Sequence, residues 1–575
     1  MALNLSALMR YVNGTIPNHT PAHDNAGKFP EYRDQLHVAF KHYSLGVASG
    51  AAEPLGTPYD ADIRLLEIFP HPTGSGRIRG SLHHYCMYVP ARRISYSAVS
   101  YVWGTQEEDR LIVIDGKGFL VTENLHTILW RLRQPDRSVY VWIDAICIYQ
   151  RMTQEKAEQL GMMANIFGTA DEVMIYLGED ADNSHLVVGF AENIVKKLMA
   201  LPESQATVKI KKRDLVKFGL PPVTDLGWKA LKDCFKRPWF ERKWILQEFT
   251  LAKLALCILG DSCFNFELLT LTHRLCRQHG LDQISVGWNS NLTIPQEHPL
   301  TVIDLIRTLV RHNFDEDPEA ETPKLPWLLG ATSYAKVSKH QHDHIYALLG
   351  LHAVSGDPLM FPYPSINYDR SVEDVFIDYA CIPEWKMPDA GTSLLELASQ
   401  SKALNLPSWV PDWSRPTSLE YVLHSNTPDT AGASVGKDRS AFTFDHSGKK
   451  LSVQGAFVDH ITEATQIIYD ENVSGVWAEE YAEMKQLGFG FLAKLTRQRC
   501  CATAKGYRLL AHHLARVGDQ IFIVYGERVP FVIRRSGVHY RLVGCAFLSS
   551  VMQGKGLAPK SPHYVGSSIQ DLTLV

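Results

Sequence analysis

Between residues 94 and 262 the chain alternates short apolar runs with segments whose apolar residues recur every three or four positions. Apolar runs without polar interruption are typical of strands that are buried on both faces. Strands that alternate with helices indicate an α/β fold with a parallel sheet and helices on both faces. The expected strands are 96–102, 139–143, 173–177 and 254–259.

Local signals add further elements to this region. Residues 111–121 predict a hairpin, because Asp115-Gly116 supplies the positive φ of a tight turn. Thr122 is expected to cap a helix whose apolar residues are Leu125, Ile128, Leu129 and Leu132. Thr153 is expected to cap a second helix, and a third helix is expected to run from Pro238 through Ala252.

The hydrophobic pattern divides the rest of the chain into three parts and marks one insertion within residues 94–262. Residues 1–93 predict an extension with one strand at 63–68. Residues 179–227 predict a polar insertion in the 94–262 domain, with the basic run 209–213 as a solvated loop. Residues 263–437 predict a mixed, partly helical region. Residues 438–575 predict a β-rich domain, a small barrel or sandwich, with a hairpin at 442–457 and strands at 520–525, 530–534 and 540–547.

Composition narrows the class of protein. The chain has 575 residues and a net charge of -4, which gives no case for nucleic acid as the main partner. Its 10 Cys are scattered and form no C-x-x-C pair, which favours a reducing compartment. Residues 1–14 are a poor match to a signal peptide, and no stretch approaches the ~20 apolar residues of a membrane span. We therefore expect a cytoplasmic protein without a membrane span.

Several common site motifs are missing from the sequence. Neither a G-x-G-x-x-G fingerprint nor a G-x-x-x-x-G-K-[ST] phosphate loop occurs, and there is no G-x-S-x-G nucleophile motif. The group His340, His342, Asp343 and His344 invites a metal interpretation. A polar loop before an apolar helix explains it more simply, so we expect no metal.

Two polar positions follow expected strands directly. Trp103-Gly104 follows the first strand and Asp144 the second. In open α/β sheets ligands bind beyond the carboxyl ends of parallel strands, which would bring Trp103, Asp144 and Cys147 near one crevice. The alternative is that Asp144 caps a turn and Trp103 is a packing anchor.

The segment 239–248 (WFERKWILQE) is the most informative. Trp244 and Glu248 are four residues apart and share one helix face. A Glu is rarely buried unless it is paired or functional. The alternative is an amphipathic helix whose Glu248 is solvated or pairs with Arg242 or Lys243.

Several blocks, in order, resemble one family. Residues 96–104 (YSAVSYVWG), 142–150 (WIDAICIYQ) and 237–248 (RPWFERKWILQE) are similar to signatures of the fungal heterokaryon incompatibility (HET) family. The later blocks 343–351 (DHIYALLGL) and 408–414 (SWVPDWS) resemble segments common downstream of that domain. One departure is Tyr149, where the family usually has Asn.

The resemblance implies a fold and a function. HET domains are distantly similar to Toll/interleukin-receptor (TIR) domains, which implies a flavodoxin-like parallel sheet and a role in growth arrest or programmed cell death. Some TIR domains cleave the nicotinamide bond of NAD with a Glu preceded by Trp four residues earlier. By this analogy Glu248 is the catalytic candidate, and Trp103, Gly104, Asp144 and Trp244 are the substrate-binding candidates.

The resemblance also leaves an alternative open, because many TIR domains are adaptors that act by homotypic assembly. If the chain is an enzyme, NAD(P) is its candidate substrate, and no cofactor or metal is expected. The expected partners are a second copy, bound through the HET domain, and an unknown incompatibility or receptor protein. For an enzyme we expect the Glu248 carboxylate within roughly 10 Å of the Trp103 or Asp144 side chain, the scale of one small-molecule cleft. A Glu248 sealed in the core against Arg242 or Arg237 is expected of the non-enzymatic alternative.

Overall fold

The structure is a computed structural model that describes residues 62–575 with gaps. The longest gaps are 286–298, 316–323, 354–363, 416–441, 469–476 and 488–497. Residues 1–61 of the expected N-terminal extension lie outside the described residues. The chain forms two compact units, and each is described by itself.

The first unit is built on a nine-stranded sheet of order β5-β4-β2-β1-β6-β3-β7-β8-β9. Four neighbouring strands run parallel, which confirms the strands that the apolar runs predict. Every residue of the strand that begins at Ser97 is buried, as expected of a strand covered on both faces. The parallel strands are β6 (Val139–Trp142), β3 (Ser97–Tyr101), β7 (Glu172–Gly178) and β8 (Ala255–Leu259).

The sheet as a whole is mixed, which corrects the expectation of a parallel sheet. Antiparallel pairs flank the four parallel strands, and tight turns join β4 to β5 and β8 to β9 at the two edges. Among the flanking strands, β2 and β4 pair in parallel. Asp115 and Gly116 both have positive φ in the expected hairpin, and Gly260 has positive φ in the turn at the other edge. The flanking strands are β1 (Asp62–Ile68), β2 (Arg79–Cys86), β4 (Glu108–Ile114), β5 (Lys117–Thr122) and β9 (Ser262–Asn265).

The sheet also extends past the limits that we expected for the domain. β1 lies between β2 and β6, so the strand predicted at 63–68 is an inner strand of the sheet. The first unit reaches Trp288 and includes Ile303–Thr308 from α12 (Pro299–Asp315). The domain expected at residues 94–262 is therefore part of a larger compact unit.

Helix signals near the sheet are largely confirmed. Thr122 caps α3 (Glu123–Leu132) by accepting the Leu125 N–H, and the four predicted apolar residues of this helix are buried. The helix expected from Pro238 to Ala252 is broken instead into the 3-10 turn η6 (Pro238–Glu241) and α9 (Ile245–Thr250). Arg242 is extended at the break. Thr153 is the first residue of α5 (Thr153–Gly161) and not its cap, because Met152 occupies the cap position. The other helices here are α4 (Asp144–Cys147) and α6 (Met163–Thr169).

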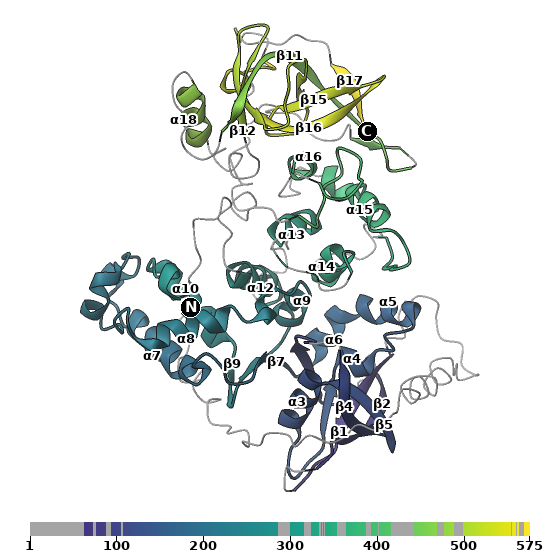
Figure 1. The fold of residues 1–575 in the computed structure, drawn as a ribbon, viewed down its shortest axis with the longest axis vertical. Coiled ribbons are helices and arrows are strands. Elements are labelled where there is room, and N and C mark those ends of the chain that lie inside the picture. Colours follow the sequence, from purple (N-terminus) through teal and green to yellow (C-terminus); the bar gives the residue numbers. More distant parts are fainter. Residues whose placement is uncertain are drawn as a thin grey trace. The chain divides into compact units, whose positions relative to one another are not determined.

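The insertion expected at 179–227 contributes to a packed helical lobe. Phe190 on one helix meets Trp228 on the next edge to face, and Gly227 lies against Phe190, so the two helices pack closely. Figure 1 shows α7, α8 and α10 gathered near β9. The lobe consists of η3 (Ser184–Leu186), α7 (Val187–Met199), η4 (Glu203–Gln205), η5 (Lys212–Phe218), α8 (Leu226–Phe235), α10 (Glu267–Gln278) and α11 (Asp282–Ser285).

The second unit joins short helices to a β-rich end. Its helical part contains α13 (Leu325–Ala331), α14 (Asp343–Ala353), α15 (Val372–Ala380), η7 (Pro383–Lys386) and α16 (Leu394–Ala398). Buried ion pairing joins this part to the strands, since Arg528 Nη2 donates to Glu396 Oε2 at 2.8 Å. The mixed region and the β-rich region that we expected are thus one compact unit.

The β-rich end is barrel-like. The long strand β11 pairs with β12 along one part and with β14 along another, which closes the sheet order β11-β12-β13-β16-β15-β14. The predicted hairpin at 442–457 and the three predicted strands beyond it are confirmed. The elements are β10 (Thr443–Phe444), β11 (Leu451–Ile468), α18 (Ala478–Gln486), β12 (Gln498–Thr503), β13 (Arg508–His512), β14 (Gln520–Val524), β15 (Phe531–Ser536), β16 (His539–Phe547), η11 (Ser549–Val551) and β17 (Gln570–Leu574).

Candidate functional site

Trp103 and Asp144 meet at the carboxyl edge of the parallel strands. β3 and β6 are parallel neighbours, so the residues that follow them emerge at the same edge. The Trp103 indole Nε1 donates to Asp144 Oδ2 at 2.9 Å. Asp144 Oδ1 also accepts the Ala145 N–H at 2.7 Å, at the start of α4. Asp144 is therefore the first residue of α4, not its cap, and its side chain binds Trp103.

Glu248 is buried, and both oxygens of its carboxylate accept hydrogen bonds. Its residue is 4% exposed. Ser100 on β3 donates its hydroxyl to Glu248 Oε2, and the Trp239 indole Nε1 donates to that same Ser100 oxygen at 2.7 Å. Arg242 reaches both carboxylate oxygens, with Nη1 at 3.3 Å from Oε2 and Nη2 at 3.5 Å from Oε1. Strand β3 and the broken helix thus hold the carboxylate from two sides.

Arg242 connects the two carboxylates electrostatically. Burial raises the pKa of Glu248, and the nearby negative charge of Asp144 raises it further, while Arg242 and the Ser100 hydrogen bond oppose the shift. Burial also raises the pKa of Asp144, opposed by Arg242 and by the hydrogen bond from Trp103. Trp103, Asp144, Arg242 and Glu248 therefore form one network, which we call the edge network.

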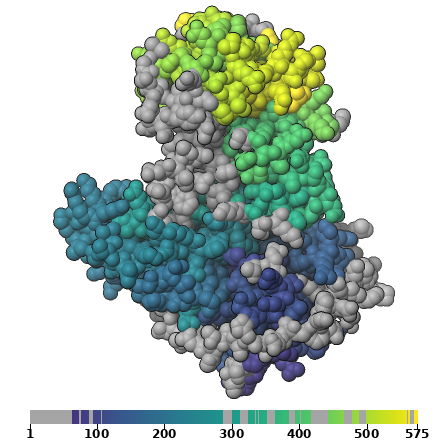
Figure 2. Space-filling view, viewed as in Figure 1, coloured from purple at the N-terminus to yellow at the C-terminus, as the bar shows by residue number. Residues whose placement is uncertain are grey.

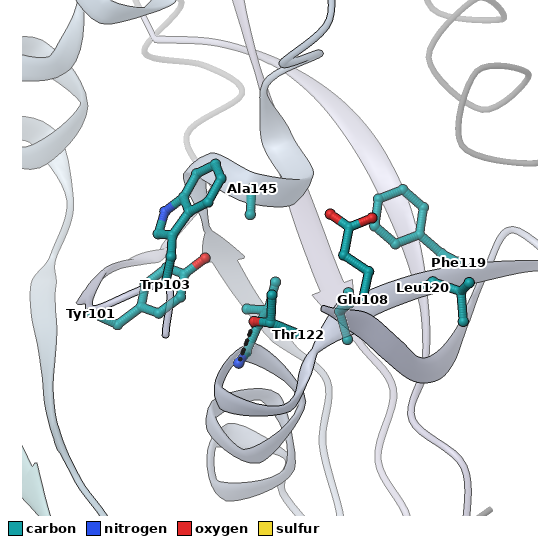
Figure 3. A pocket seen from close by; sticks show the side chains of 9 residues that line it. Tyr101, Trp103, Glu108, Phe119, Leu120, Thr122 and Ala145 are labelled. Atoms are coloured by element: carbon teal, nitrogen blue, oxygen red, sulfur yellow. Dashed lines mark hydrogen bonds between the residues drawn. The ribbon is translucent and has the colours of Figure 1, made fainter. Parts of the chain in front are cut away.

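A small cavity lies beside the edge network. Figure 3 shows Tyr101 and Trp103 on one side of it, with Glu108, Phe119 and Leu120 of the β4–β5 hairpin on the other. The cavity volume is about 10 Å³. That is room for about one water molecule, whereas pockets for small ligands have ~300 Å³ or more. This cavity does not hold a nucleotide in the described conformation.

The other site candidates lie around the edge network with different exposure. Gly104 has φ +76°, so the turn after β3 favours glycine at this position. Trp244 is half-buried, and its carbonyl accepts the Glu248 N–H at 3.2 Å, in the same helical turn. Cys147, expected near a crevice, is instead buried, and burial raises the pKa of its thiol to about 12.

The histidine-rich segment is held by hydrogen bonds. His342 Nε2 lies 2.9 Å from the Arg370 carbonyl oxygen, and the Tyr368 hydroxyl donates to Asp343 at 2.6 Å. In the part of the chain that the structure describes, no group of three His, Cys, Asp or Glu side chains could hold a metal ion. No helix in the described ranges combines the length and the apolarity needed to cross a membrane.

The sequence did not identify three residues that contact or position the site residues. Ser100 and Trp239 position Glu248, and Tyr101 lies close enough to Asp144 to form a hydrogen bond. The strand carried a signal, since Ser100 is one of two polar residues, with Ser97, in a fully buried strand. Arg242 was foreseen only as a pairing partner of Glu248 and not as a link to Asp144.

Comparison with known proteins finds similarity to heterokaryon incompatibility proteins. Residues 96–248 match the family model described as heterokaryon incompatibility protein (HET). Heterokaryon incompatibility protein 6 (OR allele) of Neurospora crassa is 25% identical over 400 residues, which cover 61% of this chain and 58% of that protein. The chain thus spans about three fifths of the length of this relative. No solved structure matches the chain.

Proposed function

We propose that this chain, whose residues 96–248 belong to the heterokaryon incompatibility (HET) family, is an effector of heterokaryon incompatibility that arrests growth or kills the cell. The observation that carries this proposal is the extent of the family match. It begins at Tyr96, just before β3, and ends at Glu248, so it contains the whole edge network. The matched segment is therefore the one that builds the site.

The burial of Glu248 favours the non-enzymatic alternative, in which the chain acts by homotypic assembly. Glu248 is buried and bound by Ser100 and Arg242, and the cavity beside Trp103 has room for about one water molecule. In this position the carboxylate holds β3 to the broken helix. On this proposal the edge network keeps the domain in one shape that a second copy recognises.

NAD(P) cleavage is the second candidate, and one observation favours it. Trp103, Asp144 and Glu248 gather around Arg242 at the carboxyl edge of the sheet. The order of the parallel strands, β6-β3-β7-β8, agrees with the first four positions of the flavodoxin-like order 2-1-3-4-5, whose ligand sites lie at this edge. Arg242 must leave Glu248 before the carboxylate can stabilise an oxocarbenium-like transition state.

Inducible expression of the full chain in a filamentous fungus tests the proposed role. We expect growth arrest in cells that express the wild-type chain. Glu248→Gln keeps the side-chain shape but removes the charge, and Glu241→Gln, at an exposed position nearby, is the matched control. Normal growth despite abundant, folded wild-type chain contradicts the effector role.

The same variants separate the two mechanisms. Toxicity of a folded Glu248→Gln chain supports assembly, and light scattering should then show an oligomer that grows with concentration. Loss of toxicity only in Glu248→Gln, together with nicotinamide release when the concentrated wild-type chain is incubated with NAD, supports cleavage and displaces the assembly mechanism.

A further inference from the structure

The helical lobe carries a dense group of positive charges. Residues 196–217 contain seven Lys or Arg and only two Asp or Glu, in a chain whose net charge is -4. Asp214 pairs with Arg213 and Lys217, and Lys209 donates to the Arg277 and Gln278 carbonyls at the end of α10. The cationic side chains are all exposed: Lys196, Lys197, Lys209, Lys211, Lys212, Arg213 and Lys217.

Exposed apolar side chains accompany these charges. Of the nine exposed large apolar residues among the described ranges, four belong to this lobe. Val216 is 67% exposed and Leu226 is 59% exposed, and Met199 and Val223 are also exposed. Such a concentration of exposed apolar groups in one lobe differs from the single scattered apolar residues of ordinary surfaces.

The charged and apolar residues belong to neighbouring segments. Gly219, which ends η5 with φ +69°, lies against Lys197 near the end of α7, since an added Cβ would be 3.6 Å from the Lys197 Cδ. The chain then continues to Pro221, whose carbonyl accepts the Trp228 indole N–H at 3.2 Å. These contacts bring η5, the end of α7 and the start of α8 together. Figure 2 shows the lobe, in blue and teal, as a rounded protrusion.

We propose that this lobe docks on an anionic lipid bilayer surface. Six of the seven cations are Lys, a flexible point charge that suits a diffuse negative surface better than the planar, bidentate geometry of Arg. Aliphatic side chains beside them can enter the boundary between headgroups and acyl chains. A single-stranded nucleic acid is a poorer fit, because single strands are bound by stacking on exposed aromatic rings and Trp228 is buried. The docking is independent of any chemistry at Glu248.

Vesicle flotation with the full-length chain tests this proposal. We expect binding to phosphatidylcholine vesicles that contain phosphatidylserine and none to vesicles of phosphatidylcholine alone, with binding lost as salt rises. The double variant Lys211→Glu/Lys212→Glu should lower the apparent affinity roughly tenfold or more. Val216→Asp should weaken binding in the same vesicles by removing an inserted aliphatic group.

The control is a second exposed pair of adjacent lysines. Lys449→Glu/Lys450→Glu makes the same change of net charge on the turn before β11, and it should leave vesicle binding unchanged. Equal binding to neutral and anionic vesicles, or an equal loss in both double variants, overturns the proposal. Binding to polyglutamate without binding to anionic vesicles also overturns it and identifies a docking face for an acidic protein.

Discussion

Arg242 spans the carboxylate of Glu248, with its two terminal nitrogens at 3.3 and 3.5 Å from the two oxygens. The Arg242 side chain is 20% exposed and that of Glu248 is 5% exposed. A pair in this position loses much of its hydration, so its net stability depends on the charge of both partners. The pH dependence of stability and the effect of replacing Arg242 both depend on the charges of this pair.

The first prediction concerns pH. Because burial raises the pKa of Glu248 above its ordinary value of 4.5, the folded chain binds this proton more tightly than the unfolded chain does. The stability that this proton provides is present below pH 4.5 and is lost as pH rises through the folded pKa. Glu248→Gln removes the titration, so the variant should gain on the wild type by up to about 1.4 kcal/mol per pH unit in that window.

Urea denaturation of both chains across this pH range measures the difference in unfolding free energy. Glu248→Ala is the informative companion, because it also leaves a cavity and should be about 2 kcal/mol less stable than Glu248→Gln at neutral pH. A wild type that becomes steadily more stable than Glu248→Gln as pH rises contradicts the raised pKa.

The second prediction concerns Arg242 itself. Arg242→Met leaves Glu248 and Asp144 without the cation that opposes the rise of their pKa values. We expect a loss of about 3 kcal/mol in unfolding free energy at pH 8, and a smaller loss at pH 5, where the carboxyls are more readily protonated. Arg242→Lys keeps the charge and should retain most of the stability. A loss that is the same at both pH values would show that Arg242 acts by packing alone.

The third prediction concerns the helical lobe. A Cβ added at Gly227 would lie 1.9 Å from a ring carbon of Phe190, so Gly227→Ala must push α8 away from α7. We expect it to cost about 2 kcal/mol or more. Gly189→Ala, on α7, is the matched control, because an added Cβ meets nothing within 4 Å and Ala favours the helix by ~0.5–1 kcal/mol. Thermal denaturation of the two variants should move the midpoint in opposite directions.

The fourth prediction concerns the end of the first unit. Arg307 on α12 is 4% exposed and donates to the carbonyls of Thr250 and Ala252 after α9, as well as to Glu267 at 3.0 Å. Arg307→Met should therefore cost about 3 kcal/mol. Arg274→Met, which breaks a half-exposed pair with Asp304, should cost less than about 1 kcal/mol.

The contacts of Arg307 also predict which fragments of the chain fold. A fragment that ends at Ser262 lacks Arg307 and most of β9, so we expect it to aggregate, whereas a fragment that ends at Asp315 should be soluble. If the second unit restrains the first, the longer fragment should be more toxic than the full chain in a fungal cell. A soluble, inert fragment in cells where the full chain kills contradicts that restraint.

The sequence by itself determined the local elements of the sheet and helices. Apolar-rich runs located β3, β6, β7 and β8, because strands buried on both faces consist mostly of apolar side chains. Asp115-Gly116 located a hairpin, since few other residue pairs adopt positive φ twice in succession. The same reasoning located Trp103 and Asp144 at one edge, because parallel strands end together.

Only the tertiary structure decided how the site is closed. Local periodicity from Pro238 predicted one continuous helix, but packing of Trp239 and Phe240 around Phe266 accompanies a break at Arg242. Ser100 and Glu248 are 148 residues apart, and no spacing rule relates residues at such a separation. Glu248 is buried because β3 and the broken helix pack around it together. A local sequence pattern contains no information about contacts between segments so far apart.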